Sequence, residues 1–245
     1  MTIINNQYNY LFIHIPKAAG KSIKQHLLQD TYGLYDRKVL QLIFALQAAG
    51  SYTQTLPVLN KLKLNPLNNN LIDPRIRRYC IENKLYSAAH LRADELVSIL
   101  GQDGYSRKFS FAFVRNPWDR CLSSYMYFRR KTFHPLHNIA MKMKFDDFLE
   151  HQDKAGMPYI GQQVQWIFDE RGEKKVNYIG HVESICSDMM DINKRLGLEY
   201  KPFTANTNAS KKRDKDYRLY YSDRSRDIVA RHMSRDIELL GYSFD

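Results

Sequence analysis

Cysteine is scarce in this sequence, and long apolar runs are missing. The three cysteines, Cys80, Cys121 and Cys186, are odd in number and show no paired spacing. This pattern is evidence against a disulfide framework and indicates reduced thiols. No run reaches the ~18 apolar residues that a membrane-spanning helix needs, and no signal peptide precedes the first apolar segment. We therefore expect a cytoplasmic protein without a transmembrane segment.

Metal-ligand patterns and internal repeats are also absent from the sequence. His134 and His137 are separated by Pro135 and have no third partner, so we expect no metal. No low-complexity linker divides the 245 residues, which are enough for one domain with a substantial core. We predict a single domain over residues 1–245. Residues 31–86 have the least diagnostic pattern, and we expect them to place helices over one side of a sheet.

Negative charge is in short supply. The chain has 37 lysines and arginines against 26 aspartates and glutamates, a net charge of +11 and a pI near 9.4. Such an excess favours polyanionic partners, among them nucleic acid, anionic lipid, a phosphorylated donor and an acidic glycan. A basic surface that only keeps the protein in solution would give the same numbers, so charge alone does not choose among these classes.

The most informative segment, residues 8–28, has the pattern of a strand, a tight turn and a helix. The unbroken apolar and aromatic run Tyr10–Ile15 is typical of a buried strand in a parallel sheet, and we expect this strand to span 8–15. Pro16 ends the strand because it brings no N–H, and a helix is expected over 20–30. Backbone N–H groups and the positive end of the helix dipole then meet at the turn, which predicts an anion site.

The residues of this turn predict that the anion is a phosphate or a group shaped like one. Lys17 and Lys21 flank the turn, and Ser22 can donate from the first helical turn. A kinase-type P-loop would require a glycine where this chain has Ile15, inside the strand. The loop is shorter than in that pattern, and no convincing strand ends in an aspartate that would hold Mg²⁺. These features argue against a nucleotide triphosphatase.

A second strand, turn and helix follow later in the chain. Phe109–Val114 is another continuous apolar run and hence another buried parallel strand. Arg115 emerges at its carboxyl end, where open α/β sheets bind ligands. Pro117 begins the next helix and Ser123 lies on its second turn, so Arg115 and Ser123 can meet one phosphate.

The remaining patterns complete an α/β fold. A third strand is expected at 176–180, a helix at 185–196 with Gly197 as its C-cap, and a closing helix at 223–240. The helix that begins at Pro117 carries apolar residues that we expect to face the sheet: Trp118, Cys121, Leu122 and Tyr125. We predict a P-loop-like, three-layer fold with a central parallel sheet flanked by helices.

Three stretches resemble a known family. HIPKAAGKS, residues 14–22, is similar to the 5′-phosphosulfate loop of sulfotransferases that use 3′-phosphoadenosine 5′-phosphosulfate (PAPS). FSFAFVRNPWDRCLSSYMYF, residues 109–128, is similar to the 3′-phosphate motif of that family. The tail, residues 208–244, is a weaker match. The branch that these stretches resemble includes the carbohydrate O-sulfotransferases.

The resemblance implies an O-sulfotransferase that moves the sulfuryl group from PAPS to an acceptor hydroxyl and releases adenosine 3′,5′-bisphosphate (PAP). It implies no metal and no nucleic acid partner. It makes the motif residues donor ligands, together with candidates in the loop 201–216, which covers the nucleotide in the family: Lys17, Ala18, Ala19, Gly20, Lys21, Ser22, Arg115, Ser123, Ser210, Lys211 and Arg213. Residues 31–86 would shape the acceptor side. A carbohydrate is the first choice of acceptor, followed by a small alcohol, a phenol or a lipid headgroup.

The resemblance also assigns catalytic roles to Lys17 and His90. Lys17 would stabilise the oxygen of the leaving phosphate. In the uronyl 2-O-sulfotransferase branch a histidine at the position of His90 is the base, and another stands two residues earlier, where this chain has Ala88. A histidine suits proton removal from a hydroxyl because its pKa lies near neutral pH. Considered alone, a single histidine is more often structural, and Asp94 and Glu95 are the alternative bases.

Two other classes of function remain open. A P-loop kinase would bind ATP with Mg²⁺ and show no preference for a 3′-phosphate. A non-catalytic binder of polyanionic glycan or nucleic acid would use the basic surface and would lose no function when His90 is changed.

Within the second motif, Asp119 and Arg120 either join the phosphate site or pair with each other.

Overall fold

The computed structural model describes residues 2–6, 8–31, 90–198 and 216–245, together with Arg75, Tyr79 and Phe203. Within them, four strands form one mixed sheet in the order β1-β2-β3-β4. The strands are β1 (Ile3–Asn5), β2 (Tyr10–Ile13), β3 (Phe109–Val114) and β4 (Tyr178–His181). Strands β2, β3 and β4 are parallel, and β1 is antiparallel to β2.

The predicted parallel sheet is correct for β2, β3 and β4 and wrong for β1. A strand of three residues carries too little alternation to be recognised in the sequence. It forms because Ile3 and Ile4, each 2% exposed, belong to the apolar clusters on opposite faces of the sheet. The return to β2 is tight: Oδ1 of Asn5 accepts the N–H of Tyr8 at 2.8 Å, and Asn9 adopts a left-handed φ of 52°.

Strands β2 and β3 are buried on both faces, as their continuous apolar runs predict. The register places Phe12 of β2 beside Phe111 of β3, and the centroids of the two rings lie 5.4 Å apart. The neighbouring strand β4 approaches closely at Gly180, where a Cβ would lie 2.6 Å from the ring of Phe113. This glycine therefore leaves room for an aromatic core inside the sheet.

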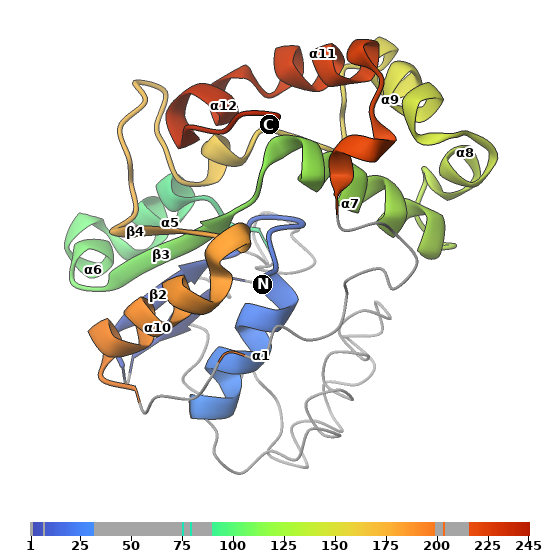
Figure 1. The fold of residues 1–245 in the computed structure, drawn as a ribbon. Helices are drawn as coiled ribbons and strands as arrows, with labels where there is room; N and C mark the ends of the chain where they lie inside the picture. Colours follow the sequence, from blue (N-terminus) through green and yellow to red (C-terminus); the bar gives the residue numbers. More distant parts are fainter. Residues whose placement is uncertain are drawn as a thin grey trace.

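Helices cover the sheet and extend beyond one of its ends (Figure 1). In chain order, the α-helices of the described residues are α1 (Gly20–Thr31), α5 (Ala93–Leu100), α6 (Gln102–Ser106), α7 (Pro117–Arg130), α8 (His137–Lys142), α9 (Phe145–Lys154), α10 (Ile185–Leu196), α11 (Asp223–His232) and α12 (Ser234–Leu240). Three short 3₁₀ helices accompany them: η1 (Gln163–Trp166), η2 (Val182–Ser184) and η3 (Tyr217–Tyr220). The helix predicted at 185–196 is confirmed, and its C-cap Gly197 has the left-handed φ of 62°.

Helices α1 and α10 pack on one face of the sheet, and α5 and α6 pack on the other (Figure 1). Ile23 of α1 and Met189 of α10 share an apolar cluster with Phe12. On the opposite face, Leu96 of α5 belongs to the cluster that contains Leu11. The predicted helix–sheet–helix layering is therefore present.

A separate apolar cluster lies beyond the sheet, among α7, α8, α9 and α11 (Figure 1). Trp118 and Tyr125 of α7 pack there with Phe145 and Phe148 of α9 and with Val229 of α11. Among the described residues, this cluster contains none from a strand. The prediction that this side of α7 faces the sheet is wrong, because neighbouring helices supply the apolar surface instead.

The closing segment consists of two helices, not the one predicted at 223–240. Helix α11 ends at His232, the next residue Met233 has a φ of −112° and a ψ of 24°, and α12 follows. Asp236 in α12 is fully buried, and its carboxylate accepts the N–H groups of Gln163 and Val164 at 2.8 and 2.9 Å. The break between the helices thus accompanies a tie between α12 and η1.

Candidate active site

The turn between β2 and α1 is sharply bent. Lys17 and Ala19 have positive φ angles of 67° and 54°. Non-glycine residues in this conformation cost about 1–3 kcal/mol each, so the surrounding structure must hold them in place. Ala18, between them, is 1% exposed and donates its N–H to the carbonyl of Ile15 at 3.4 Å. Burial of Ala18 therefore anchors the bend.

Backbone donors gather where this turn enters α1. The N–H groups of Ser22 and Ile23 donate to the carbonyl of Ala19 at 2.9 and 3.2 Å. The N–H groups of Ala19, Gly20 and Lys21 have no acceptor among the residues that the structure describes. Unsatisfied donors at a helix N-terminus, reinforced by the helix dipole, suit an anion.

His14, directly after β2, lies against this turn. A Cβ on Gly20 would come within 1.9 Å of its imidazole, so the glycine at the start of α1 leaves the space that the ring occupies. The ring centroid of His14 lies 4.7 Å from that of His90. Sequence reasoning missed His14; its place at the carboxyl end of a parallel strand was the available signal.

His90 is held in one tautomer. Its Nδ1 lies 3.1 Å from the carbonyl oxygen of His14, and a carbonyl only accepts, so Nδ1 carries the proton and Nε2 keeps a lone pair. Desolvation lowers the pKa of His90 from 6.5 to about 4, although the hydrogen bond to His14 opposes this shift. The indole N–H of Trp166 donates to the carbonyl of His90 at 3.0 Å. At neutral pH the ring is uncharged and can accept a proton at Nε2.

Helix α7 runs beside the turn. The ammonium of Lys17 lies 4.5 Å from the centre of the Tyr127 ring, within cation–π range. Nη1 of Arg115 donates to the carbonyl oxygen of Lys17 at 3.4 Å. Ser123 precedes Tyr127 by one helical turn, so both lie on the same face of α7. Arg115 precedes Ser123 and Tyr127 follows it, and both contact Lys17, so this face of α7 lies along the turn.

Arg115 is fixed by its own side chain and by its backbone. Nε and Nη2 contact Oδ2 of Asp119 at 2.7 and 2.6 Å. The side-chain amide of Gln163 accepts the N–H of Arg115 at 2.9 Å and donates to its carbonyl at 2.7 Å. Gln163 is fully buried and also donates to Asp236 at 3.3 Å. No local pattern marks Asp236, because its partners lie more than 70 residues away in the sequence.

Of the two alternatives for Asp119 and Arg120, pairing with each other is not what the structure shows. Asp119 pairs with Arg115. Arg120 is 1% exposed and lies 3.8 Å from Oδ2 of Asp236. Its guanidinium also donates to the carbonyl of Gly161. Arg120 is therefore buried in the core beneath the site, where its positive charge stabilises the carboxylate of Asp236.

Of the two alternative bases, Glu95 is engaged in the structure. Its Oε2 accepts the N–H of Arg92 at 2.7 Å, and its Oε1 accepts the hydroxyl of Tyr79 at 3.2 Å. Glu95 thus serves the N-terminus of α5. Asp94 is exposed in the same helical turn and faces a cavity.

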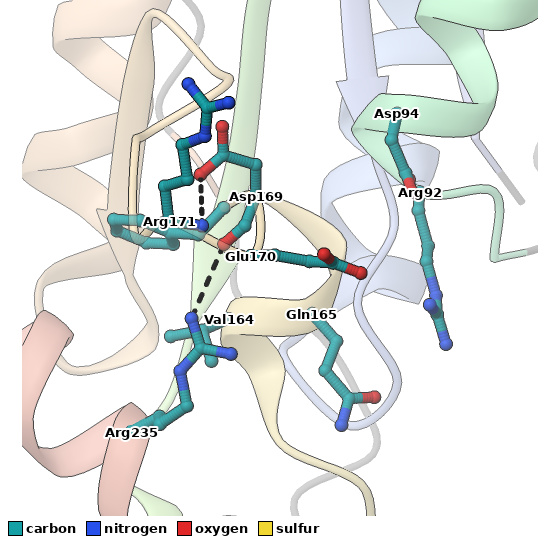
Figure 2. Close-up of a pocket in the computed structure, with 9 residues that line it drawn as sticks. Arg92, Asp94, Val164, Gln165, Asp169, Glu170, Arg171 and Arg235 are labelled. Carbon is teal, nitrogen blue, oxygen red and sulfur yellow. Dashed lines mark hydrogen bonds between the residues drawn. The ribbon is translucent and has the colours of Figure 1, made fainter.

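This cavity, of about 490 Å³, opens beside the segment that carries His90. It is lined by residues from the start of α5, from η1 and the chain after it, and from α12 (Figure 2): Arg92, Asp94, Val164, Gln165, Phe168, Asp169, Glu170, Arg171 and Arg235. Arg92 follows His90 by two residues, and Gln165 precedes Trp166, whose indole binds the His90 carbonyl. The cavity therefore shares its walls with the segments that hold His90.

Comparison with known proteins identifies the family. The model of the sulfotransferase family matches residues 1–243. The chain belongs to this family. No curated protein and no solved structure matches the sulfotransferase. The family predicted from the two motifs is therefore confirmed over nearly the whole chain, and with it a transferase of sulfuryl groups.

The structure brings the predicted donor residues of the sulfotransferase into two adjoining groups. Residues 17–22 form the turn and the start of α1, and Arg115 and Ser123 belong to the β3–α7 segment that contacts it. The predicted ligands in the loop 201–216, Ser210, Lys211 and Arg213, lie outside the described residues, as does most of the segment 31–86. The predicted site is thus continuous where it is described.

Two features are absent from the residues that the structure describes. These residues contain no group of three His, Cys, Asp or Glu residues placed to hold a metal ion. None of their helices combines the length and the apolar character needed to cross a membrane.

Proposed function

We propose that this sulfotransferase moves the sulfuryl group of PAPS to an acceptor hydroxyl. Two segments of the chain would bind the donor together, one at each of its phosphorylated ends. The observation that carries the proposal is the 3.4 Å contact between Nη1 of Arg115 and the carbonyl of Lys17. It joins the turn after β2 to the turn after β3. A nucleotide with phosphates on both its 5′ and 3′ oxygens has the two anionic ends that these segments require.

The residues present fit such a donor. The N–H groups of Ala19, Gly20 and Lys21 lack acceptors among the described residues, and the hydroxyl of Ser22 lies in the same helical turn. Together with the Lys17 ammonium they would hold the 5′-phosphosulfate. When bound, PAPS supplies the sulfuryl group and a phosphate leaving group. The lysine and the backbone dipoles would stabilise negative charge that develops on the bridging oxygen.

Arg115 and Ser123 would hold the 3′-phosphate. A guanidinium has five N–H donors, and Asp119 engages one on Nε and one on Nη2. Three donors remain, one of which contacts the carbonyl of Lys17. Asp119 thus orients the guanidinium without exhausting it. This group provides the preference for a 3′-phosphorylated nucleotide over ATP or AMP.

His90 would take the proton of the attacking hydroxyl at Nε2. The fixed tautomer presents a lone pair there, and the pKa of about 4 keeps the ring uncharged at neutral pH. A base this weak gains strength when anionic groups bind nearby, because negative charge raises a histidine pKa. General-base catalysis of this kind contributes about 10²–10⁴-fold to a rate.

Thermal unfolding in the presence of PAP, ATP and AMP tests the donor class. A ligand that binds only the folded state stabilises it in proportion to the logarithm of its concentration over Kd. We expect PAP to raise Tm more than equal concentrations of AMP or ATP with Mg²⁺. Equal shifts with PAP and AMP would contradict a 3′-phosphate site, and a preference for ATP would indicate a kinase.

Direct transfer is measured by incubating the protein with PAPS and a panel of glycans and small alcohols, followed by mass spectrometry. A gain of one sulfuryl group on a carbohydrate hydroxyl is the expected result. A product formed only from phenols or lipid headgroups would retain the reaction and replace the acceptor class. Retention of full transfer by His90→Gln would remove His90 from the mechanism.

A further inference from the structure

We infer that residues 129–144, which comprise the end of α7, the following turn and α8, dock on an anionic phospholipid bilayer. The side chain of Phe133 would enter the bilayer, and the lysines and arginines around it would bind the headgroups. The inference goes beyond the proposed sulfuryl transfer and does not depend on it, because docking is measured by binding alone. We call residues 129–144 the basic segment.

The basic segment carries charge of one sign. Its sequence, RRKTFHPLHNIAMKMK, contains five lysines and arginines and no aspartate or glutamate. None of the five forms an ion pair with a residue that the structure describes. Nη1 of Arg129 donates to the hydroxyl of Tyr125 at 2.7 Å, and Nε of Arg130 donates to a backbone carbonyl at 3.2 Å. These positive charges therefore remain available to an anionic partner.

Large apolar side chains are exposed at the same place. Among the described residues, five large hydrophobic side chains are exposed, and three lie in or beside the basic segment. The exposed fractions are 70% for Phe133, 49% for Met141 and 50% for Tyr159. Phe133 lies in the turn between α7 and α8, and Met141 lies on α8 next to the exposed Lys142. Apolar side chains rimmed by charges mark an interaction surface.

Ring contacts join these residues into one surface. The Lys131 ammonium lies 5.7 Å from the centre of the Phe133 ring, and the rings of His134 and Tyr159 lie 5.3 Å apart. Lys131 and His134 each lie 6.0 Å from the ring of Tyr127. Helix α8 packs beside the end of α7 at the edge of the molecule (Figure 1). Cations and apolar side chains therefore occupy one continuous patch.

The turn that carries Phe133 is held on both sides. The N–H of His134 donates to the carbonyl of Lys131 at 2.8 Å, and the N–H of His137 donates to the carbonyl of His134 at 2.8 Å. The His134 ring stacks on Phe128, with 4.3 Å between the ring centroids. Because its neighbours are anchored, Phe133 is presented outwards by a fixed turn. Docking then requires little ordering of the chain, which lowers its entropic cost.

An anionic bilayer matches both features of the patch. Lysines and arginines bind anionic headgroups, and apolar side chains enter the boundary between headgroups and acyl chains. The ring of a tyrosine such as Tyr159 suits the headgroup level, because it is apolar with a polar hydroxyl. An acidic glycan would neutralise the charges but would leave Phe133 and Met141 in water. The combination therefore favours a bilayer over a soluble polyanion.

The docking surface reaches the proposed donor site. The Tyr127 ring, which Lys131 and His134 contact, also lies 4.5 Å from the ammonium of Lys17. A bilayer bound to the basic segment would therefore hold the sulfotransferase with its proposed donor site close to the membrane surface.

Vesicle sedimentation tests the inference without requiring turnover. The protein is mixed with vesicles of phosphatidylcholine alone or of equal parts phosphatidylcholine and phosphatidylserine, at low and at high salt. We expect at least about tenfold tighter binding to the anionic vesicles. Salt should weaken this binding because it screens exposed charges. Heparin, titrated separately, serves as a polyanion without an apolar phase.

The variant Phe133→Ser distinguishes a bilayer from a soluble polyanion. It should lower the affinity for anionic vesicles about tenfold, because an apolar ring no longer leaves water, and should leave the affinity for heparin unchanged. Leu219→Ser is the matched control, since Leu219 is 73% exposed on η3, outside the basic segment. This control should bind vesicles as the unmodified protein does.

A double variant, Arg130→Gln with Lys142→Gln, tests the charges. Both residues are exposed, and a lysine or arginine near an anionic membrane contributes about fivefold to binding. The double variant should therefore bind anionic vesicles about 25-fold more weakly. Arg107→Gln with Lys174→Gln is its control, because these exposed residues precede β3 and β4 at the other end of the sheet. We expect this control to retain the affinity.

Insertion is measured with Phe133→Trp. Brominated acyl chains should quench the added indole in anionic vesicles, whereas they should not quench the indole of Leu219→Trp. Unaltered Tm in each variant would show that the fold is intact.

Absence of vesicle binding, equal binding to neutral and anionic vesicles, or undiminished vesicle binding by Phe133→Ser would overturn the inference. Binding of heparin without binding of vesicles would also overturn it and would identify a soluble polyanion as the partner. PAP affinity should be the same in all these variants. Failure of the unmodified protein to bind PAP would contradict the proposed donor alone.

Discussion

The two strand–turn–helix segments, β2–α1 and β3–α7, share one plan and differ in how their helices begin. At the start of α7, Oδ1 of Asn116 accepts the N–H groups of Trp118 and Asp119 at 3.0 and 3.4 Å. At the start of α1, Ala19, Gly20 and Lys21 have N–H groups without acceptors among the described residues. The first segment therefore offers backbone donors to an anion, whereas the second has used its own.

The surroundings of the two turns differ in the same sense. Gln163 holds both backbone polar groups of Arg115, and Oε1 of Glu183 accepts the N–H of Asn116 at 2.7 Å. The turn after β3 is thus satisfied internally, and only its side chains are available to a ligand. The turn after β2 contains left-handed Lys17 and Ala19 and lies against the ring of His14, which in turn contacts His90.

This difference predicts that one segment contributes mainly to catalysis and the other mainly to donor binding. A segment that binds through its backbone keeps its affinity when a side chain is removed, so its side chain is free to act on the transition state. A segment that binds through side chains loses affinity when they are removed. The turn after β2 should therefore govern kcat, and the turn after β3 should govern donor binding.

The largest effect is expected from Lys17→Ala. Loss of one donor to a developing oxyanion costs about 10²–10³-fold in kcat, whereas PAP affinity should change little because the backbone N–H groups remain. Steady-state kinetics with PAPS and calorimetry with PAP measure the two quantities separately. Lys154→Ala, at an exposed lysine on α9, is the control and should change neither. An unchanged kcat in Lys17→Ala would remove this lysine from catalysis.

The converse effect is expected from Arg115→Ala. Hydrogen bonds to charged groups contribute ~1.5–3 kcal/mol each, so Kd for PAP should rise about 10- to 100-fold. Binding of AMP, which lacks the 3′-phosphate, should be unaffected. Arg107→Ala removes the same charge at the other end of β3 and should alter neither ligand. If PAP and AMP weakened equally, Arg115 would act on the fold or on the 5′ end.

A shift in pH dependence is expected from His14→Ala. Removal of this ring would lessen the desolvation of His90, whose pKa should rise from about 4 towards the ordinary 6.5. In the proposed mechanism His90 acts unprotonated, so the acid limb of kcat/KM should move to higher pH. NMR titration of His90 measures the pKa directly. An acid limb that stayed near pH 4 would show that His14 does not set the environment of His90.

His90 also makes the stability of the protein depend on pH. Between pH 6.5 and about 4 the unfolded chain binds a proton that the folded His90 does not, so the free energy of unfolding falls as pH falls through this window. His14→Ala should reduce this dependence, because the pKa values of the folded and unfolded states would approach each other. Chemical denaturation at pH 7 and pH 5 provides the measurement.

Local patterns were sufficient for the parallel strands and the motif turns. Phe109–Val114 is a strand with the bounds that its apolar run predicts, and Pro117 begins α7. Both depend on neighbours in the sequence: a continuous apolar run, and a proline whose missing N–H is harmless at the first helical position. The anion site that we predict at the turn of Lys17 rests on the same kind of local chemistry, and it stays a prediction.

Features that depend on distant partners were not predictable. Asp236 finds its hydrogen-bond donors only where α12 packs against η1. The apolar side of α7 packs against neighbouring helices and not against the sheet. Likewise, His14 and His90 are 76 residues apart, and only the fold brings their rings into contact. Such residues share no spacing that a single sequence could reveal.

The smallest effect is expected at the contact between Lys17 and Tyr127, which also joins the two segments. Tyr127 lies 4.5 Å from the Lys17 ammonium, and a cation–π contact contributes ~0.5–1 kcal/mol, about two- to fivefold. Tyr127→Phe keeps the ring and should preserve kcat, whereas Tyr127→Leu should lower it by that factor with PAP affinity unchanged. If both variants behaved alike, the ring would serve only as packing. A larger loss in Tyr127→Leu than in Lys17→Ala would contradict the order of effects, because a residue that positions Lys17 cannot matter more than Lys17 itself.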